Sequence, residues 1–308
     1  MPLSRRQILS SLTAASLLPA LPMRHAFAQD SPPPFPVPAV PPLDTRDYAQ
    51  ARQSFRTNLL RQGPSPEQSG PLGEPPGARR VFYPGGPDGT LKLIAWVSQY
   101  EPSVKLKPAV LFLHGGNATG DGHWELVMPY AKAGFVVMLP SFRGENGQAG
   151  NYSGFYDETS DALAAADFLE NLPGIDRSRI YLAGHSNGGT LSLLAGMTRP
   201  FRAAVPISAG VSAWRYFGRY RKEIPFDPKD PSELVMRSSV CFGASLKCPT
   251  LLLRGTEERP FDDNHQLLIT RARSAGQTID HRLLPGTHNG VVPAAVEESI
   301  RFFRHYGA

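Results

Sequence analysis

Short apolar runs alternate with helical patterns through most of the chain after residue 100. The apolar runs cover residues 109–113, 135–139, 180–183, 203–207, 250–253 and 279–284. Helical patterns follow most of them, at about 124–133, 157–171, 187–198, 263–275 and 292–306. Buried strands that alternate with helices predict an α/β class fold, with a largely parallel sheet covered by helices on both faces. Sites in such open sheets lie in loops beyond the carboxyl ends of the strands.

The pattern before residue 100 is different. Residues 80–83 and 91–99 alternate apolar and polar positions on either side of a Gly-Pro-Asp-Gly turn, which predicts an antiparallel hairpin. Residues 44–62 carry apolar side chains at intervals of three or four, which predicts one amphipathic helix. These apolar side chains are Tyr48, Ala51, Phe55 and Leu59. Residues 63–78 are rich in Gly and Pro and are expected to form a loop, so 44–79 would be a helix and loop ahead of a main domain at 80–308.

Two segments of unusual composition open the chain. Residues 1–28 combine Arg5-Arg6, a short apolar run and a final Ala-Phe-Ala, the layout of a secretory signal. The paired arginines resemble the twin-arginine type, so we expect the export machinery that reads this signal as a partner and a periplasmic or secreted location. Pro19 and Pro22 interrupt the apolar run, so no stable membrane anchor is expected. Residues 29–43 hold the proline run SPPPFPVPAVPP and predict an extended linker.

Composition narrows the possible functions. The formal charge is +5 and would fall to +2 with the loss of the three arginines before residue 29. No block of like charges remains, so nucleic acid is not an expected partner. No metal-binding, phosphate-binding or dinucleotide-binding motif is found, so no cofactor and no metal is expected. Cys241 and Cys248 could form a disulfide in an oxidising compartment or remain as buried thiols.

The strongest chemical motif is Gly184-His185-Ser186-Asn187-Gly188, which lies between a predicted strand and a predicted helix. A serine on such a sharp turn projects its hydroxyl from the sheet edge, and small neighbours let the backbones approach. The helix amino terminus behind it favours developing negative charge. Ser186 is therefore the expected nucleophile.

These residues resemble the α/β-hydrolase superfamily, in particular the branch of prolyl oligopeptidase catalytic domains and dienelactone-hydrolase-like esterases. The resemblance covers about residues 80–307. It rests on the turn around Ser186 and on segments 113–116 (Leu-His-Gly-Gly), 140–144 (Pro-Ser-Phe-Arg-Gly) and 285–290 (Pro-Gly-Thr-His-Asn-Gly). The fold implied is an α/β-hydrolase fold with a small lid, and residues 210–247 are the expected lid segment.

A serine hydroxyl needs a base to take its proton, and the base needs an acid to orient it. Chain order in this fold is serine, acid, histidine. His288, in the turn after the last predicted strand, fits the base. The acid is expected after the strand 250–253, where the resemblance points to Glu258 at a position that usually holds Asp; Asp262 is the alternative.

Two further groups of residues are expected at the site. The backbone N–H groups of Gly116 and Asn187 are the expected oxyanion hole, the pair of donors that stabilises negative charge in the transition state. Trp214, Tyr216 and Phe217 in the lid segment could form an aromatic substrate wall, or could pack on the domain while nearby cations stay in water.

The expected activity is that of an exported serine hydrolase, a carboxylesterase that works through an acyl-enzyme. The alternative is a prolyl-oligopeptidase-like peptidase for short peptides, without the propeller that large members of the branch carry before the hydrolase. The third possibility is a non-catalytic binding protein on the same fold. Activity is expected to rise with pH as His288 becomes neutral.

Overall fold

The computed structural model describes residues 32–86, 88–258 and 262–307, so the expected signal at 1–28 lies outside the described residues. In the described chain, one eight-stranded sheet has the order β1-β2-β4-β3-β5-β6-β7-β8. The strands are β1 (Ala78–Gly85), β2 (Leu91–Ser98), β3 (Lys107–Leu113), β4 (Val136–Pro140), β5 (Ile175–His185), β6 (Ala204–Ile207), β7 (Thr250–Gly255) and β8 (Ile279–Leu284). β1 and β2 form the predicted antiparallel hairpin, β2 also runs antiparallel to β4, and all later pairs are parallel.

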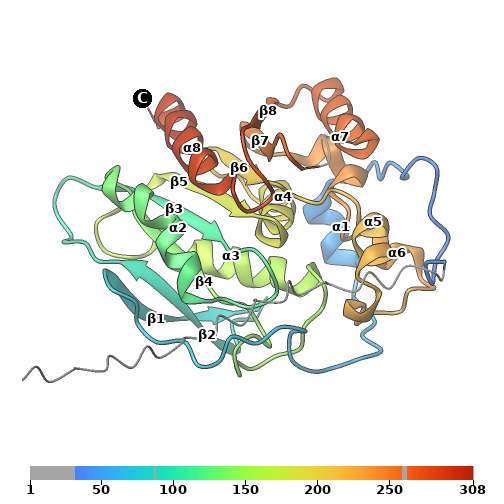
Figure 1. Ribbon diagram of the computed structural model, residues 1–308, viewed down its shortest axis with the longest axis horizontal. Helices are drawn as coiled ribbons and strands as arrows, with labels where there is room; N and C mark the ends of the chain where they lie inside the picture. Colours follow the sequence, from blue (N-terminus) through green and yellow to red (C-terminus); the bar gives the residue numbers. More distant parts are fainter. Residues whose placement is uncertain (1–31, 87, 259–261, 308) are drawn as a thin grey trace, which may run out of the picture. The chain divides into compact units, whose positions relative to one another are not determined.

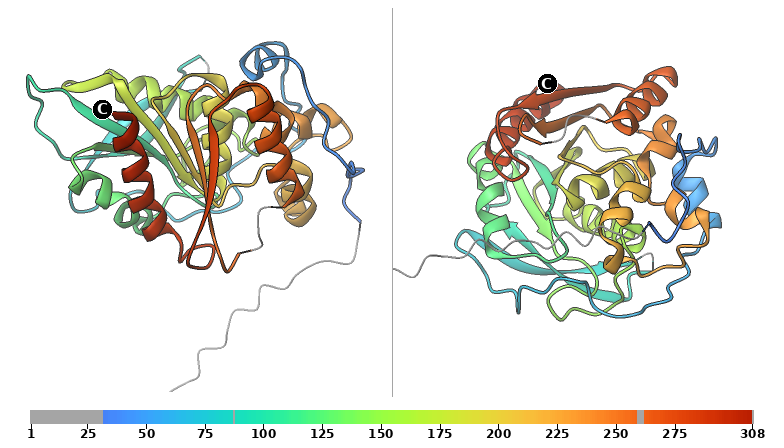
Figure 2. Two further views of the ribbon diagram at one scale, coloured as in Figure 1. Left: turned by 90° about the horizontal axis from the view of Figure 1, so that it is seen from above. Right: turned by 45° about the vertical axis from the view of Figure 1, so that its right-hand side comes forward.

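Helices cover both faces of this sheet, as the alternating pattern predicted (Figure 1). They are α1 (Tyr48–Ser54), α2 (Asp121–Lys132), α3 (Tyr156–Glu170), α4 (Asn187–Thr198), α5 (Ala213–Arg219), α6 (Pro231–Val235), α7 (Asp263–Ser274) and α8 (Val292–Gly307), with short 3₁₀ helices η1 (Arg221–Glu223) and η2 (Ser239–Ser245). Figure 2 shows α7 and α8 on opposite sides of β8.

The sheet divides the apolar core into two clusters. Along β3, Leu111 and Leu113 belong to the cluster that includes α3, α4 and α7, whereas Val110 and Phe112 belong to the cluster that includes α2 and α8. Successive side chains of a strand point to opposite faces, so this continuous apolar run is buried on both sides. The prediction of an α/β fold is confirmed.

The predicted helix at 44–62 is too long, because α1 ends at Ser54. Beyond it, the backbone N–H of Asn58 and the hydroxyl of Thr57 donate to the buried carboxylate of Glu233, and Leu59 forms an isolated bridge with Phe226. These partners belong to a distant part of the chain and hold the segment extended. Long-range contacts therefore override the local helical periodicity.

The described part of the expected linker, residues 32–43, packs on the domain. Phe35 is buried, and Arg271 of α7 donates to the backbone carbonyls of Pro41 and Pro42. Prolines cannot donate a backbone hydrogen bond, but their carbonyls accept one. The segment has no regular secondary structure, bends at 34–35 and 39–40, and is not a free spacer.

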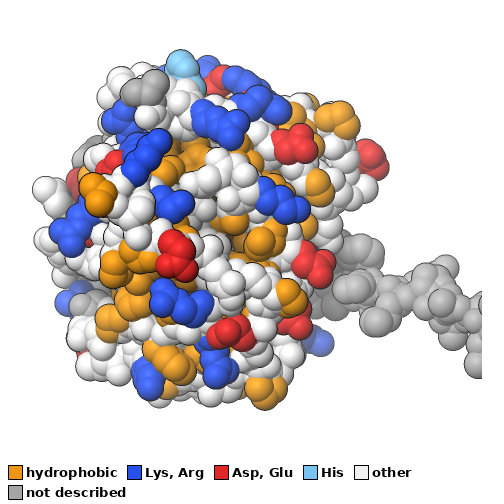
Figure 3. Space-filling view, turned by 90° about the vertical axis from the view of Figure 1, so that its left-hand side faces the viewer, with side chains coloured by type: hydrophobic (Ala, Val, Ile, Leu, Met, Phe, Trp, Pro, Cys, Tyr) orange, Lys and Arg blue, Asp and Glu red, His pale blue; other side chains and the backbone are white. Residues whose placement is uncertain are grey.

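Charged side chains are mixed on the face of the molecule in Figure 3. Lys and Arg side chains are spread over this face, with Asp, Glu and apolar side chains between them. This distribution agrees with the lack of long like-charge blocks in the sequence.

Candidate active site

Ser186 lies on a sharp turn between the end of β5 and the start of α4. Its φ of 55° and ψ of −114° are unusual for a residue with a side chain and indicate a strained turn. A Cβ on Gly184 would lie 2.3 Å from the Gly188 oxygen, and one on Gly188 would lie 2.0 Å from the Leu113 oxygen. Only glycine fits these two positions, and the close packing they allow leaves Ser186 lining a cleft.

The expected acid and base lie in the loops after β7 and β8, and both are close to this serine. His288 follows β8, and its Nε2 lies 3.0 Å from the Ser186 Oγ. Its Nδ1 lies 2.7 Å from Oε2 of Glu258, which follows β7. With Glu258 ionised, Nδ1 donates to the carboxylate, and Nε2 is then free to accept the serine hydroxyl proton. The structure therefore brings Ser186, His288 and Glu258 into one hydrogen-bonded chain.

Glu258 is well shielded and held as a carboxylate. Its side chain is 4% exposed, and its Oε1 accepts hydrogen bonds from the Ser208 hydroxyl at 2.5 Å and the Gly255 N–H at 2.8 Å. Burial acts to raise the pKa of Glu258, but hydrogen bonds from His288, Ser208 and Gly255 outweigh burial and lower the pKa to about 2. The acid opposite the imidazole stays ionised through the neutral range.

Asp262, the alternative acid, is engaged elsewhere. Its carboxylate caps α7 by accepting from the N–H groups of Asn264 and His265, and it accepts from the His265 ring Nδ1 at 2.8 Å. Its other oxygen lies 3.4 Å from Arg215 Nε. The geometry thus favours Glu258 over Asp262 as the partner of His288.

The two expected oxyanion donors both border the cleft beside Ser186. Asn187 is the first residue of α4, so its backbone N–H has no acceptor within the helix. Gly116 has a φ of +71°, a conformation that glycine adopts without strain. The Asn187 side chain also joins the two loops, because its Nδ2 donates to the Gly116 carbonyl at 3.1 Å. Their catalytic use remains a prediction.

His185, the residue before the nucleophile, connects the nucleophile turn to the loop that carries His288. Its Nε2 donates to the backbone carbonyl of His288 at 2.8 Å, and the two rings lie 4.8 Å apart. Burial lowers the pKa of His185 to about 4, so its ring is neutral at pH 7. Its place next to the nucleophile was visible in the sequence, but its contact with a loop 103 residues away was not.

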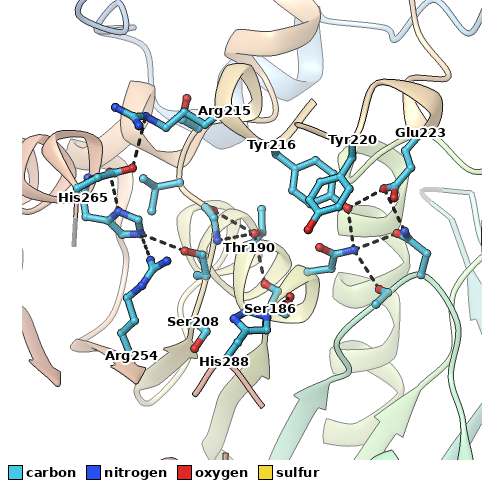
Figure 4. A pocket seen from close by; sticks show the side chains of 18 of the residues that line it. Ser186, Thr190, Ser208, Arg215, Tyr216, Tyr220, Glu223, Arg254, His265 and His288 are labelled. Atoms are coloured by element: carbon cyan, nitrogen blue, oxygen red, sulfur yellow. Dashed lines mark hydrogen bonds and ion pairs between the residues drawn. The ribbon is translucent and has the colours of Figure 1, made fainter. Parts of the chain in front are cut away.

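The cleft has a volume of about 300 Å³ and two ends of different character. Figure 4 shows Tyr216, Tyr220 and Glu223 at one end, and Arg215, Arg254 and His265 at the other, with Ser186 and His288 between them.

At the tyrosine end of the cleft, the Glu223 carboxylate accepts from the Tyr216 hydroxyl at 2.8 Å and from Asn117 Nδ2 at 3.1 Å. Burial raises the pKa of Glu223.

The three aromatic candidates of the lid segment, residues 210–247, divide between the two alternatives left open by the sequence. Of the three, only Tyr216 lines the cleft; Trp214 and Phe217 are 5% and 0% exposed and belong to the core. The reason is helical geometry, since positions 214 and 217 lie three apart on the inner face of α5. Sequence reasoning missed Glu223 in this segment and Glu67 ahead of the main domain, both of which line the cleft.

Three other observations bear on the expected chemistry. Among the residues that the structure describes, no group of three or more His, Cys, Asp and Glu side chains could hold a metal ion. In the same ranges, no helix is long and apolar enough to cross a membrane. Cys241 and Cys248 are both buried free thiols, and burial raises their pKa values to about 12 and about 11.

A mostly parallel eight-stranded sheet, with a serine on the turn from the fifth strand to the following helix, defines the α/β-hydrolase fold. The sequence profile of the prolyl oligopeptidase family matches residues 123–287, more than half of the chain. The chain therefore belongs to the prolyl oligopeptidase family, which confirms the resemblance found in the sequence.

Two curated relatives carry different activities in their names. The chain is 28% identical over 170 residues to the uncharacterized peptidase YtmA of Bacillus subtilis (strain 168), an alignment that covers 52% of this chain and 66% of that protein. It is 26% identical over 237 residues to the thermostable monoacylglycerol lipase of Bacillus sp. (strain H-257), covering 64% and 91%.

Solved structures share the fold at low identity. The acylaminoacyl peptidase of Pyrococcus horikoshii is 18% identical with a TM-score of 0.60, and a puromycin-hydrolyzing peptidase of Mycobacterium tuberculosis is 21% identical with a TM-score of 0.62. Each match covers 74% of this chain, but only 40% and 39% of those proteins. The chain thus spans about two fifths of these structures and 66% of the YtmA peptidase.

Proposed function

We propose that this protein is a serine hydrolase that works through an acyl-enzyme. The observation that carries the proposal is the contact chain from the Ser186 hydroxyl through the His288 imidazole to the Glu258 carboxylate. Ser186 is the nucleophile, His288 the general base and acid, and Glu258 the group that orients His288 and stabilises its cation. Gly116 and Asn187 supply the oxyanion-hole N–H groups.

The reaction has two halves. The Ser186 Oγ attacks the substrate carbonyl carbon while His288 Nε2 takes its proton, and the carbonyl oxygen becomes an oxyanion. His288 then gives that proton to the leaving amine or alcohol as its bond to the carbonyl carbon breaks, which leaves an ester on Ser186. Water repeats the sequence: it loses a proton to His288, attacks the ester carbon and releases the acid, and the proton returns to Ser186.

For the substrate, we favour a peptidase for short peptides or related amides over the carboxylesterase that the sequence first suggested. Membership of the prolyl oligopeptidase family and similarity to a peptidase support this choice. A cleft of about 300 Å³, at the low end of ligand-site volumes, suits a small substrate such as a short peptide. The carboxylesterase remains the second candidate because the monoacylglycerol lipase is similar to this chain over 91% of its length.

A two-part experiment tests the proposal. The first part labels the protein with a fluorophosphonate, which should react with the wild type and not with Ser186→Ala. Absence of labelling in a folded wild type would favour the non-catalytic binding protein. The second part compares kcat/KM for amide and ester substrates with the same acyl group. Hydrolysis of aminoacyl arylamides supports the peptidase, whereas hydrolysis of esters alone supports the carboxylesterase.

We further propose that the protein is exported by the twin-arginine machinery to the periplasm or the medium. The paired arginines and apolar run of residues 1–28 support this proposal. In a bacterial host, the full-length chain should be processed and recovered outside the cytoplasm. Arg5→Lys combined with Arg6→Lys should leave the precursor inside; export of that variant at the wild-type rate would refute this route.

A further inference from the structure

A short part of the chain ahead of the family match lies against the loop that carries Gly116. Residues 63–69, here called the strap, are held by hydrogen bonds to the connection between β4 and α3. The Ser65 N–H and Gln68 Nε2 both donate to the Gly144 carbonyl at 2.9 Å, and the Tyr152 N–H donates to the Gly63 carbonyl at 3.0 Å. The strap therefore holds a fixed place beside the cleft.

From this strap, Glu67 reaches the loop that would form the oxyanion hole. Its Oε2 accepts the backbone N–H of Asn117 at 2.8 Å. The carbonyl of the same peptide group, that of Gly116, accepts from Asn187 Nδ2 at 3.1 Å. One peptide is thus held at both of its polar atoms, and any rotation of this peptide would break both hydrogen bonds.

This restraint matters because the Gly116 N–H belongs to the peptide just before the restrained one. The preceding peptide, which carries the Gly116 N–H, is held by its Gly115 carbonyl, 3.0 Å from His114 Nδ1. A glycine at a φ of +71° has more backbone freedom than any other residue, so the direction of its N–H depends on how the two flanking peptides are held. His114 holds one of them; Glu67 and Asn187 hold the other.

We propose that Glu67 is a positioning residue that acts through Asn117 to aim the Gly116 N–H at the oxyanion. This inference rests on the proposed serine hydrolase function. The contribution of Glu67 is a hydrogen-bond acceptor rather than a negative charge. A negative charge near a developing oxyanion acts against it, and because Glu67 is exposed, water screens part of this repulsion. Glutamine keeps an acceptor of the same reach without that charge.

A second carboxylate just beyond the strap provides a control. Glu74, a few residues further on, is an exposed carboxylate that also accepts a backbone N–H, that of Arg80, at 2.9 Å. Glu74 does not line the cleft, whereas Glu67 does. Both residues are therefore glutamates that accept a backbone N–H, and they lie close together in the sequence. They differ in whether that N–H belongs to the loop that carries Gly116.

The experiment compares Glu67→Ala, Glu67→Gln and Glu74→Ala, with active sites counted by fluorophosphonate titration so that only folded enzyme enters kcat. Loss of one complete oxyanion donor typically costs 10²- to 10³-fold. Because Glu67→Ala loosens a donor without removing it, we expect kcat to fall about tenfold, with KM within about twofold of the wild type. Glu67→Gln should restore kcat to within about threefold, and Glu74→Ala should match the wild type.

Binding of a boronic acid gives a second readout. Its tetrahedral anionic adduct occupies the oxyanion hole, so its affinity should fall in Glu67→Ala by about the same factor as kcat/KM. Equal increases of KM in both Glu67 variants with kcat unchanged would make Glu67 a substrate-binding group and overturn the proposal. So would Glu67→Ala kinetics equal to those of Glu74→Ala. Failure of the wild type to react with fluorophosphonate would instead remove the proposed function itself.

Discussion

The two halves of the cleft are attached to the sheet in different ways. Ser186, Glu258 and His288 each lie within four residues of the end of a parallel strand, so short turns fix their positions. Glu67, Tyr216 and Glu223 belong to the strap and the lid segment, which reach the cleft only through contacts with distant parts of the chain. Rigid strand ends suit the groups that make and break bonds. Segments attached by long-range contacts can change in sequence without disturbing the sheet.

The largest expected effect distinguishes Glu258 from Asp262, the alternative acid. Below, the strand-borne half means Ser186, Glu258 and His288 with the strand ends that carry them. Glu258→Gln removes the charge opposite His288 Nδ1 and allows the wrong tautomer, so kcat should fall by about 10³- to 10⁴-fold. Asp262→Asn, which changes a helix cap and a partner of His265, should lower kcat less than about fivefold. Steady-state kinetics with titrated active sites measures both. Equal losses in the two variants would remove the distinction between the two carboxylates.

The next effect concerns how the N-terminal part and the lid segment are joined. Glu233 and Arg237 of the lid segment form an ion pair whose side chains are both fully buried, and Glu233 also holds Thr57 and Asn58. Glu233→Gln leaves the Arg237 cation without its counter-charge, so the free energy of unfolding should fall by about 3 kcal/mol. Urea unfolding measures this change.

A matched variant separates that loss from a general effect of charge removal. Glu125→Gln changes an exposed residue of α2 and should alter the free energy of unfolding by less than about 0.5 kcal/mol. Well below the unfolding temperature, Glu233→Gln should raise KM while its rate of fluorophosphonate labelling stays within about threefold. Loss of labelling with an intact fold would show that the strand-borne half depends on the lid segment after all.

The contrast between the halves also explains what could be read from the sequence. The turn around Ser186 was predictable because its glycines and flanking elements are neighbours in the chain, and His288 followed from chain order. Glu67 carries no local signal, since it meets Asn117 across 50 residues. The overlong helix at 44–62 has the same cause, because Asn58 is held by a residue 175 positions away. Rules based on periodicity and short motifs use only residues that are close in the sequence, so they cannot predict such contacts.

A third prediction concerns acid stability of the strand-borne half. The pKa of His185 is lowered from 6.5 to about 4 by burial, so the unfolded chain binds more protons between these values. The free energy of unfolding should therefore fall as the pH drops from about 6.5 to about 4, by on the order of 2 kcal/mol from this residue. Glu258, with its pKa near 2, contributes stability that is lost only below about pH 4.5.

Unfolding at a series of pH values distinguishes these windows. His185→Gln, which keeps a donor for the His288 carbonyl, should reduce the slope between pH 6.5 and 4.5 without abolishing it, because burial also lowers the pKa of His123 to about 4. A change at the exposed His305 should leave the slope as it is. An unchanged slope in His185→Gln would mean that another group controls acid stability.

The smallest expected effect concerns the recognition half of the cleft, formed by the strap and the lid segment. It tests whether this half affects substrate binding rather than the chemical step. The Tyr216 hydroxyl donates to Glu223 at 2.8 Å and accepts from Asn187 Nδ2 at 3.1 Å, so it connects the lid segment to the helix behind the nucleophile. Tyr216→Phe leaves the partly buried Glu223 carboxylate with one donor fewer, a cost of about 1 kcal/mol. We expect KM to change by about fivefold and kcat by less than twofold, with Tyr220→Phe, at a more exposed ring of the same end, giving a smaller change in KM. If kcat falls and KM does not, Tyr216 acts through Asn187 on the oxyanion hole, and the division of the cleft into a chemical half and a recognition half fails at this residue.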